Sequence, residues 1–324
     1  MSTAQHSAQE LKTLFEEYLF EKAFEGFPDI LLEPAMQIMK TKAKRIRPVL
    51  LLTACEAFGG SAREALSAAS AIEIYHNFTL VHDDIIDEAD LRRNVETVHH
   101  KFGINKAILT GDAMLIQAYD LLSHSKHHTD ILPVFKKTAM EVIEGEQQDV
   151  DFEDREEISL KEYMEMIRLK TSVLLAAALQ IGAVIGGASE ANQKKIYQLG
   201  MNLGLAFQIK DDYLDSFGDQ KTFGKKIGGD ILQNKKTYLL CKAMEKSGEK
   251  EKEEIKTTFR ETNPDVKINR MIDLYHQLSI PEDTENQMEA HYNQAMKYLQ
   301  EVSLDPKQMI RLRQLAEDIY QRSF

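Results

Sequence analysis

Apolar residues recur at intervals of three and four along nearly the whole chain, which is the spacing of an amphipathic helix. The pattern predicts long helices over residues 62–82, 105–123, 133–148, 160–188, 191–216 and 234–246. A further helix is expected around Leu11 to Leu19, and two or three more from about Lys267 onward. No segment alternates as a half-buried strand does. The pattern therefore predicts an all-α bundle of roughly ten or more helices.

The most apolar stretch, from Ser172 to Ala188, raises the question of a membrane span. A spanning helix needs about 20 apolar residues. This stretch is shorter, is interrupted by Gln180 and is rich in Ala and Gly. We therefore expect a buried central helix and no membrane span. The charged segment from Lys246 to Lys256 is expected to form a solvated connection or helix face.

The composition favours one compact domain that comprises residues 1–324. The chain has only 7 Pro and 16 Gly, and no Ser/Pro/Gly-rich linker interrupts it. The formal net charge of −12 argues against a nucleic-acid partner, because phosphate binding relies on basic surface. A local basic pocket could still hold a small anion. Cys55 and Cys241 are too few for a disulfide scaffold, which favours a reduced, cytoplasmic protein.

Two aspartate-rich pentads are the most informative feature of the chain. Residues 83–87 read DDIID and residues 211–215 read DDYLD. On a helix, the first and last Asp of each pentad share one face. Like charges at that spacing cost about 0.2–0.5 kcal/mol, so their repetition predicts a site for hard cations. Acidic oxygen ligands favour Mg²⁺ or Mn²⁺ over Zn²⁺.

The residues that flank the first pentad suggest a phosphate ligand. His76 lies about 20° from Asp83 on a helical wheel, and Asp87 about 40°. Arg92 and Arg93 follow within two turns. Carboxylates that hold cations, next to guanidinium groups that grip phosphate, suit a metal–phosphate complex. The alternative is a solvated acidic helix end that is paired with the two arginines.

Further basic residues lie near each pentad. Gln208 precedes Asp211 by three residues, and a glycine-containing segment after Asp215 carries Lys225, Lys226, Lys235 and Lys236. Upstream of both pentads, the run KTKAKRIRP carries Lys42, Lys44, Arg45 and Arg47 directly before Pro48. Because Pro favours the first turn of a helix and a helix N-terminus attracts anions, an anion pocket is expected there.

The pair His82-Asp83 allows another hypothesis, a metal-dependent phosphohydrolase. Such a site needs more His ligands to a transition metal. His99 and His100 are available, but this hypothesis leaves the second pentad unexplained.

Taken in order, KRIRP, HNFTLVHDDIIDEADLRR, GEQQD, KT, FQIKDDYLD, GKKIGGDI and NKKT resemble the motifs of the trans-isoprenyl diphosphate synthases, or polyprenyl synthetases. The resemblance extends from residue 40 to about residue 240. It implies the isoprenoid synthase fold, an all-α bundle around a deep central cavity with the two Asp motifs across its mouth. It also implies three Mg²⁺ ions and a homodimer.

The resemblance gives each group of polar residues a role. It implies that the metal ligands are Asp83, Asp84, Asp87, Asp211 and Asp215. It implies that the allylic diphosphate is held by Arg92, Lys170, Lys225 and Lys235. The residues near the developing allylic cation would be Thr171 and Gln208, with Lys170 as a third catalytic residue. The isopentenyl diphosphate pocket would comprise Lys44, Arg47, His76 and Arg93.

The implied reaction joins isopentenyl diphosphate head-to-tail (1'-4) to dimethylallyl, geranyl or farnesyl diphosphate and releases pyrophosphate. No dedicated protein base is required. The sequence departs from the family pattern at Lys42-Ala43, where Gly-Gly is usual, at Asn94, where Gly is usual, and at Glu146, where Gln is usual. An altered affinity for isopentenyl diphosphate is the expected consequence.

In this family, the residues four and five before the first Asp motif form a floor for the growing chain. Here they are Thr79 and Phe78, and an aromatic residue at the fifth position resembles the short-chain enzymes. The expected product is C20, with C15 as the alternative. A longer-chain synthase and a non-catalytic subunit of a heteromeric synthase are further alternatives. A terpene cyclase, or a squalene or phytoene synthase, would not carry this pair of motifs.

Overall fold

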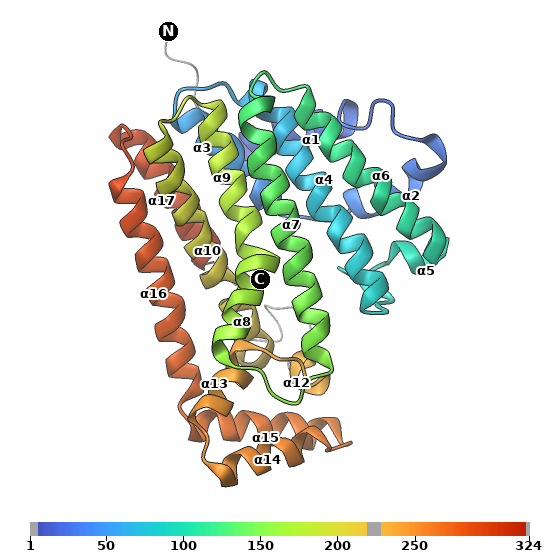
Figure 1. The fold of residues 1–324 in the computed structure, drawn as a ribbon, viewed down its shortest axis with the longest axis vertical. Helices are drawn as coiled ribbons and strands as arrows, with labels where there is room; N and C mark the ends of the chain where they lie inside the picture. Colours follow the sequence, from blue (N-terminus) through green and yellow to red (C-terminus); the bar gives the residue numbers. More distant parts are fainter. Residues whose placement is uncertain (1–5, 219–227, 322–324) are drawn as a thin grey trace. The chain divides into compact units, whose positions relative to one another are not determined.

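The computed structural model describes residues 6–218 and 228–321 (Figure 1). Within these ranges, the only strands are two short ones of two residues each, so the predicted all-α class is confirmed. The Cα positions group the chain into two compact units. The first unit comprises Met1–Lys136, Ala177–Lys194 and Ser303–Leu312, and the second comprises Lys137–Ala176, Lys195–Val302 and Arg313–Phe324. The expected single domain stays a prediction.

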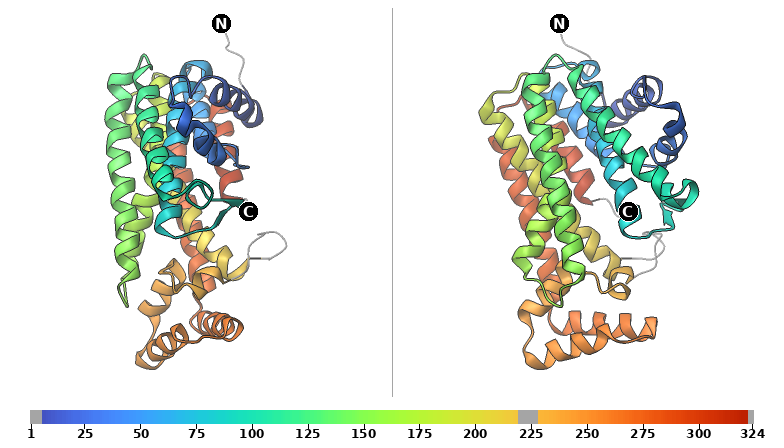
Figure 2. Two further views of the ribbon diagram at one scale, coloured as in Figure 1. Left: turned by 90° about the vertical axis from the view of Figure 1, so that its right-hand side faces the viewer. Right: turned by 45° about the vertical axis from the view of Figure 1, so that its right-hand side comes forward.

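The first unit contains the first aspartate pentad. Its complete elements are α1 (Ala8–Glu21), α2 (Asp29–Met39), α3 (Ile46–Ala57), α4 (Ala62–Ile86), β1 (Leu91–Arg92), β2 (Val95–Glu96), α5 (Val98–Phe102) and α6 (Ile104–Ser123). The long helix α4 packs most extensively against α6 and also against α3. Figure 2 shows α2 beside α6. This packing fixes the end of α4, where the pentad lies.

The second unit contains the second pentad. Its complete elements are α8 (Leu160–Ile167), the π-helix η1 (Arg168–Ser172), α12 (Gly229–Leu232), α13 (Tyr238–Lys246), α14 (Glu249–Phe259), α15 (Pro264–Gln277) and α16 (Ile280–Glu301). The helices with residues in both units are α7 (His128–Glu153), α9 (Val173–Ile185), α10 (Glu190–Phe217) and α17 (Pro306–Gln321). Tyr163, Ile209 and Tyr238 belong to one apolar cluster, and Leu239, Met271 and Tyr275 to another.

The predicted helices are present, and most of their ends lie within a few residues of the expected positions. The segment from residue 234 becomes helical only at Tyr238, because Thr237 caps α13 by accepting a hydrogen bond from the Leu240 amide at 3.3 Å. The charged segment after Lys246 forms α14, which lies beside α15 (Figure 1). Three helices, α15, α16 and α17, complete the chain as expected.

The apolar stretch that raised the membrane question is part of a continuous helical segment, Leu160–Ile185. Among the described residues, this is the one helix long and apolar enough to cross a membrane, and 78% of its most apolar window is buried. Burial by protein supports the expectation of a core helix. The π-helical turn in its middle was not foreseen, and it contains the predicted catalytic residues Lys170 and Thr171.

Candidate active site

The first pentad ends helix α4, and its three carboxylates have different surroundings. Asp87 is exposed, Asp83 is half-buried, and Asp84 is only 1% exposed. Asp84 Oδ1 accepts a hydrogen bond from Arg92 Nε at 2.6 Å. Burial raises the pKa of Asp84, while the charge of Arg92 opposes that shift. The middle aspartate therefore anchors an arginine, and its predicted role as a metal ligand stays a prediction.

Strands β1 and β2 form a hairpin with a two-residue turn, and this hairpin contains the two predicted arginines, Arg92 in β1 and Arg93 in the turn. Its turn residues, Arg93 and Asn94, have φ values of 53° and 62°. Two successive left-handed residues form the type I′ turn that suits a tight hairpin, and Asn tolerates this conformation. Asn94 can therefore replace the usual Gly. Arg93 Nη1 donates to Thr41 Oγ1 at 3.2 Å, which connects the hairpin to the basic loop before α3.

Positive charge is concentrated around His76 on α4. Burial lowers the pKa of His76 well below its usual value, and Arg47, Arg93 and Arg92 lower it further, so the imidazole is neutral at pH 7. Burial lowers the pKa of Arg47 to about 10. Arg47 Nε is buried, and no hydrogen-bond acceptor for it lies among residues 6–218 and 228–321. An unsatisfied guanidinium nitrogen among other cations is suited to an anionic ligand.

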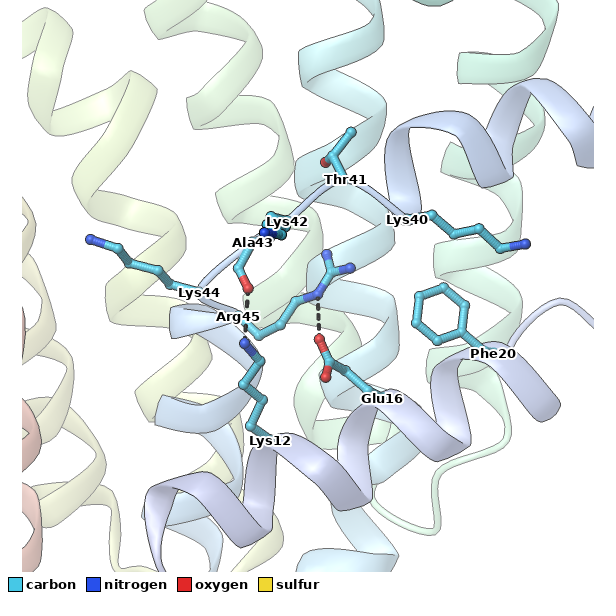
Figure 3. Close-up of a pocket in the computed structure, with 9 residues that line it drawn as sticks. All are labelled: Lys12, Glu16, Phe20, Lys40, Thr41, Lys42, Ala43, Lys44 and Arg45. Carbon is cyan, nitrogen blue, oxygen red and sulfur yellow. Dashed lines mark hydrogen bonds and ion pairs between the residues drawn. The ribbon is translucent and has the colours of Figure 1, made fainter. Parts of the chain in front are cut away.

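The basic loop before α3 combines a structural arginine with a projecting lysine (Figure 3). Arg45 is buried with φ 54°, and its guanidinium pairs with Glu73 at 2.8 Å and Glu16 at 3.4 Å. Lys12 donates to the carbonyl of Ala43 at 3.1 Å. Lys44 points away from these contacts in Figure 3. Helix α1 thus holds the loop at the position where the family usually has Gly-Gly.

This loop also lines an open surface pocket of about 590 Å³. The pocket residues are Lys12, Glu16, Phe20, Lys40, Thr41, Lys42, Ala43, Lys44 and Arg45. The concentration of lysines makes the pocket locally positive in a chain of net charge −12.

In the second unit, the π-helix η1 positions Lys170 between two acids. Its Nζ lies 2.8 Å from Glu146 Oε2 and 2.7 Å from Asp149 Oδ2 on α7. Helix α7 can approach so closely because residue 145 is Gly: a Cβ there would lie 2.4 Å from the Lys170 backbone nitrogen. π-helical turns inside α-helices occur frequently at functional sites. The ammonium group of the predicted Lys170 is therefore held by two carboxylates, those of Asp149 and Glu146.

Thr171 and Gln208, predicted from the motifs, are in direct contact. Thr171 Oγ1 donates to Gln208 Oε1 at 3.1 Å, and Gln208 Nε2 donates to Asp212 Oδ1 at 3.2 Å. Asp212 is 5% exposed and also accepts hydrogen bonds from the Tyr163 hydroxyl and, at 2.7 Å, from the Tyr238 amide. Burial raises the pKa of Asp212 to about 7, against the effect of the last two hydrogen bonds. Asp212 thus orients Gln208.

Lys235 lies in the turn between α12 and α13, and a buried lysine supports that turn. Lys267 of α15 is 5% exposed and donates to the carbonyls of Leu232 and Phe259, each at 3.2 Å. Burial would lower the pKa of Lys235, but the carboxylates of Asp149 and Asp230 outweigh it and raise that pKa. Lys235 therefore stays protonated near acidic residues of the same unit.

The structure thus brings together two sets of predicted residues, each within one unit. The first set is Arg47, His76, Arg92 and Arg93, and the second is Lys170, Thr171 and Gln208. Lys225 lies outside the described residues. Sequence reasoning missed Asp212 and Lys267. The sequence does carry a signal for Asp212: consecutive residues lie 100° apart on a helix, so Asp212 and Asp211 point in different directions. No sequence signal marks Lys267.

Comparisons with known proteins identify the family of the chain. The model of the polyprenyl synthetase family matches residues 28–275. The chain belongs to this family. A geranylgeranyl pyrophosphate synthase from Geoglobus acetivorans is 43% identical over 242 residues, which are 74% of this chain and 76% of that protein. A geranylgeranyl diphosphate synthase from Sulfolobus acidocaldarius is 36% identical over 280 residues, or 84% of each chain.

The structural comparison supports the same assignment. A crystal structure of a geranylgeranyl pyrophosphate synthase superposes with a TM-score of 0.93 at 43% identity and covers 99% of this chain and 100% of that one. The resemblance to the trans-isoprenyl diphosphate synthases is therefore confirmed, and the polyprenyl synthetase described here is a short-chain prenyltransferase.

The contacts of Lys170 generate a prediction for Glu146. Replacing Glu146→Gln restores the residue usual in the family and leaves Lys170 with one fewer anionic partner. We expect the KM for the allylic diphosphate to fall roughly 1.4- to fivefold, from the ~0.2–1 kcal/mol typical of surface ion pairs. Steady-state kinetics at saturating isopentenyl diphosphate measures this. Glu144→Gln, an exposed position on the same helix, is the matched control. A raised KM in Glu146→Gln alone would contradict the prediction.

Proposed function

We propose that this polyprenyl synthetase condenses isopentenyl diphosphate with an allylic diphosphate to form the C20 prenyl diphosphate. The observation that carries the proposal is the family match over residues 28–275 in a chain that keeps every aspartate of both pentads. A non-catalytic subunit would be expected to lose some of these aspartates. C15 is the alternative product, and the aromatic Phe78 argues against longer ones.

The proposed reaction begins with cleavage of the allylic carbon–oxygen bond, whose electron pair leaves with pyrophosphate. Arg92, Lys170 and Lys235 would hold the departing pyrophosphate, and the sequence adds Lys225 to this group. The hydroxyl of Thr171 and the amide oxygen of Gln208 would lie near the positive charge that develops on carbon. The Thr171–Gln208 contact and the fixed orientation of Gln208 support these roles.

The alkene of isopentenyl diphosphate then supplies the electron pair of the new carbon–carbon bond. Loss of a proton to the released pyrophosphate completes the step, so no protein base is assigned. Lys44, Arg47, His76 and Arg93 would hold the diphosphate of this substrate. The buried, unsatisfied Arg47 Nε and the neutral imidazole among arginines support this pocket. A cavity poor in water protects such a cation.

We propose that divalent cations are held by Asp83, Asp87, Asp211 and Asp215, with Asp84 in a supporting role through Arg92. Hard oxygen donors suit Mg²⁺, with Mn²⁺ as a substitute, and the family resemblance implies three ions. No group of three His, Cys, Asp or Glu side chains in the described parts of the chain forms a metal site alone. Substrate diphosphate oxygens are therefore expected to complete the coordination. The bound ions would neutralise charge on the leaving group.

We further propose a homodimer and a cytoplasmic location. Helix α6 exposes Ile104, Leu109 and Ile116, which supports an interface with a second copy. Both cysteines are buried and unbridged, which agrees with a reducing compartment. Light scattering should give twice the mass of one chain, and the mass of a single chain would contradict the dimer. Cell fractionation tests the location.

The activity is tested with radiolabelled isopentenyl diphosphate and, in turn, dimethylallyl, geranyl and farnesyl diphosphate. In the presence of Mg²⁺ we expect C20 product from each primer, and a chelator should abolish incorporation. Products of C30 or longer from farnesyl diphosphate would contradict the proposed length. No incorporation with any primer would contradict the proposed activity itself.

A further inference from the structure

His82 contacts the side chain proposed to limit product length. Phe78 and His82 are one turn apart on α4, and their ring centroids lie 4.9 Å apart at 71°. On its other side, Phe78 contacts Tyr75, with centroids 5.4 Å apart. Phe78 is only 6% exposed, so its ring is held by packing, to which these two rings contribute.

The two neighbours of Phe78 differ in how they are fixed. Tyr75 is completely buried and packs edge-on against Phe135 at 5.2 Å, which in turn packs against Tyr119 at 5.1 Å. Tyr75 therefore belongs to a continuous aromatic core. His82 is half-buried and, besides Phe78, contacts helix α6. Its position depends on α6.

Helix α6 fixes His82 in two ways. The imidazole Nε2 donates to the carbonyl of Ile108 at 3.2 Å. One turn further along α6, Gly111 leaves the space that the imidazole fills: a Cβ at position 111 would lie 2.3 Å from Nε2 and 2.6 Å from Cδ2. Any side chain at 111 would therefore displace the imidazole or separate the two helices. In the sequence His82 forms a His-Asp pair with Asp83, but neither metal binding nor catalysis accounts for the contacts of His82 with α6.

We propose that His82 and Gly111 are specificity-determining positioning residues, which hold the ring of Phe78 in place and thereby set the length of the prenyl product. This inference rests on the proposed function, because it takes Phe78 as the floor for the growing chain. The imidazole would act as a wedge between α6 and Phe78. Without the wedge, Phe78 can move towards α6 and admit a longer chain.

A set of His82 variants separates ring packing from hydrogen bonding. His82→Ala removes both, His82→Asn keeps a donor without the ring, and His82→Phe keeps a ring without the donor. Farnesyl diphosphate and labelled isopentenyl diphosphate serve as substrates, and the product lengths are measured at equal total incorporation. We expect His82→Ala and His82→Asn to raise the ratio of longer products to C20 roughly tenfold, since one apolar group can change discrimination by that factor. His82→Phe should keep the wild-type distribution.

Gly111→Ala tests the same contact from the opposite helix. With geranyl diphosphate as the primer in place of farnesyl diphosphate, the added methyl group should push the imidazole towards Phe78 and raise the proportion of C15 product over C20. Asn105→Ala, at an exposed position of α6, is the control and should leave the distribution unchanged. Phe78→Ala provides the reference for a missing floor and should lengthen the product. Circular dichroism spectra and melting temperatures establish which variants fold.

The outcomes separate this inference from the proposed function. An inactive wild-type protein would contradict the proposed function. Lengthening in Phe78→Ala with an unchanged distribution in both folded Ala variants, at positions 82 and 111, would overturn the inference alone. An unchanged distribution in Phe78→Ala would overturn the floor and the inference together. A folded His82→Ala without any turnover, if His82→Phe were also inactive, would place His82 in the chemistry and likewise overturn the inference.

Discussion

The concentration of arginine charge around His76 is the constraint on which the first unit depends. Burial lowers the pKa of His76, and the charges of four arginines lower it further: Arg47, Arg93, Arg92 and Arg45. Two buried acids neutralise part of the charge, because Glu73 pairs with Arg45 and Asp84 pairs with Arg92. The remaining charge, with the unsatisfied Arg47 Nε, favours an anionic ligand. The arginines are thus neutralised partly by buried acids of the protein and, in the proposed function, partly by the diphosphate of the substrate.

In the second unit, a buried hydrogen-bond network lies around Asp212, in addition to the ion pairs of Lys170 with Glu146 and Asp149. Asp212 is buried and receives hydrogen bonds from Tyr163, Tyr238 and Gln208. This network connects α8, α10 and the start of α13, and through Gln208 it reaches Thr171 in the π-helical turn. A buried network of this kind tolerates little movement of its members. In the proposed reaction, this network would orient Thr171 and Gln208 near the developing allylic cation.

Much of the fold could be predicted because the spacing of apolar residues follows the buried face of each helix. The start of α13 differs from the predicted residue 234 because the cap at Thr237 sets it. The motifs also identified Thr171 and Gln208, which are in contact. The π-helical turn had no signature in the sequence, and it lies where α7 approaches closely at Gly145, a contact between residues distant in sequence. On a helical wheel Phe78 lies about 140° from Asp83, so periodicity does not relate it to the pentad, and only the structure shows the rings that it contacts. The anchoring roles of Asp84 and Asp212 likewise depend on partners distant in sequence.

The proposed function requires both pentads to act on the same metal–diphosphate complex, and a double-mutant cycle on pyrophosphate binding tests this requirement most directly. Calorimetry would measure binding of inorganic pyrophosphate with Mg²⁺ to the wild type, Asp83→Asn, Asp211→Asn and the double variant. If both aspartates serve one complex, the loss of binding free energy in the double variant should differ from the sum of the single losses by about 1 kcal/mol or more. Strictly additive losses, or binding that does not depend on Mg²⁺, would contradict the account.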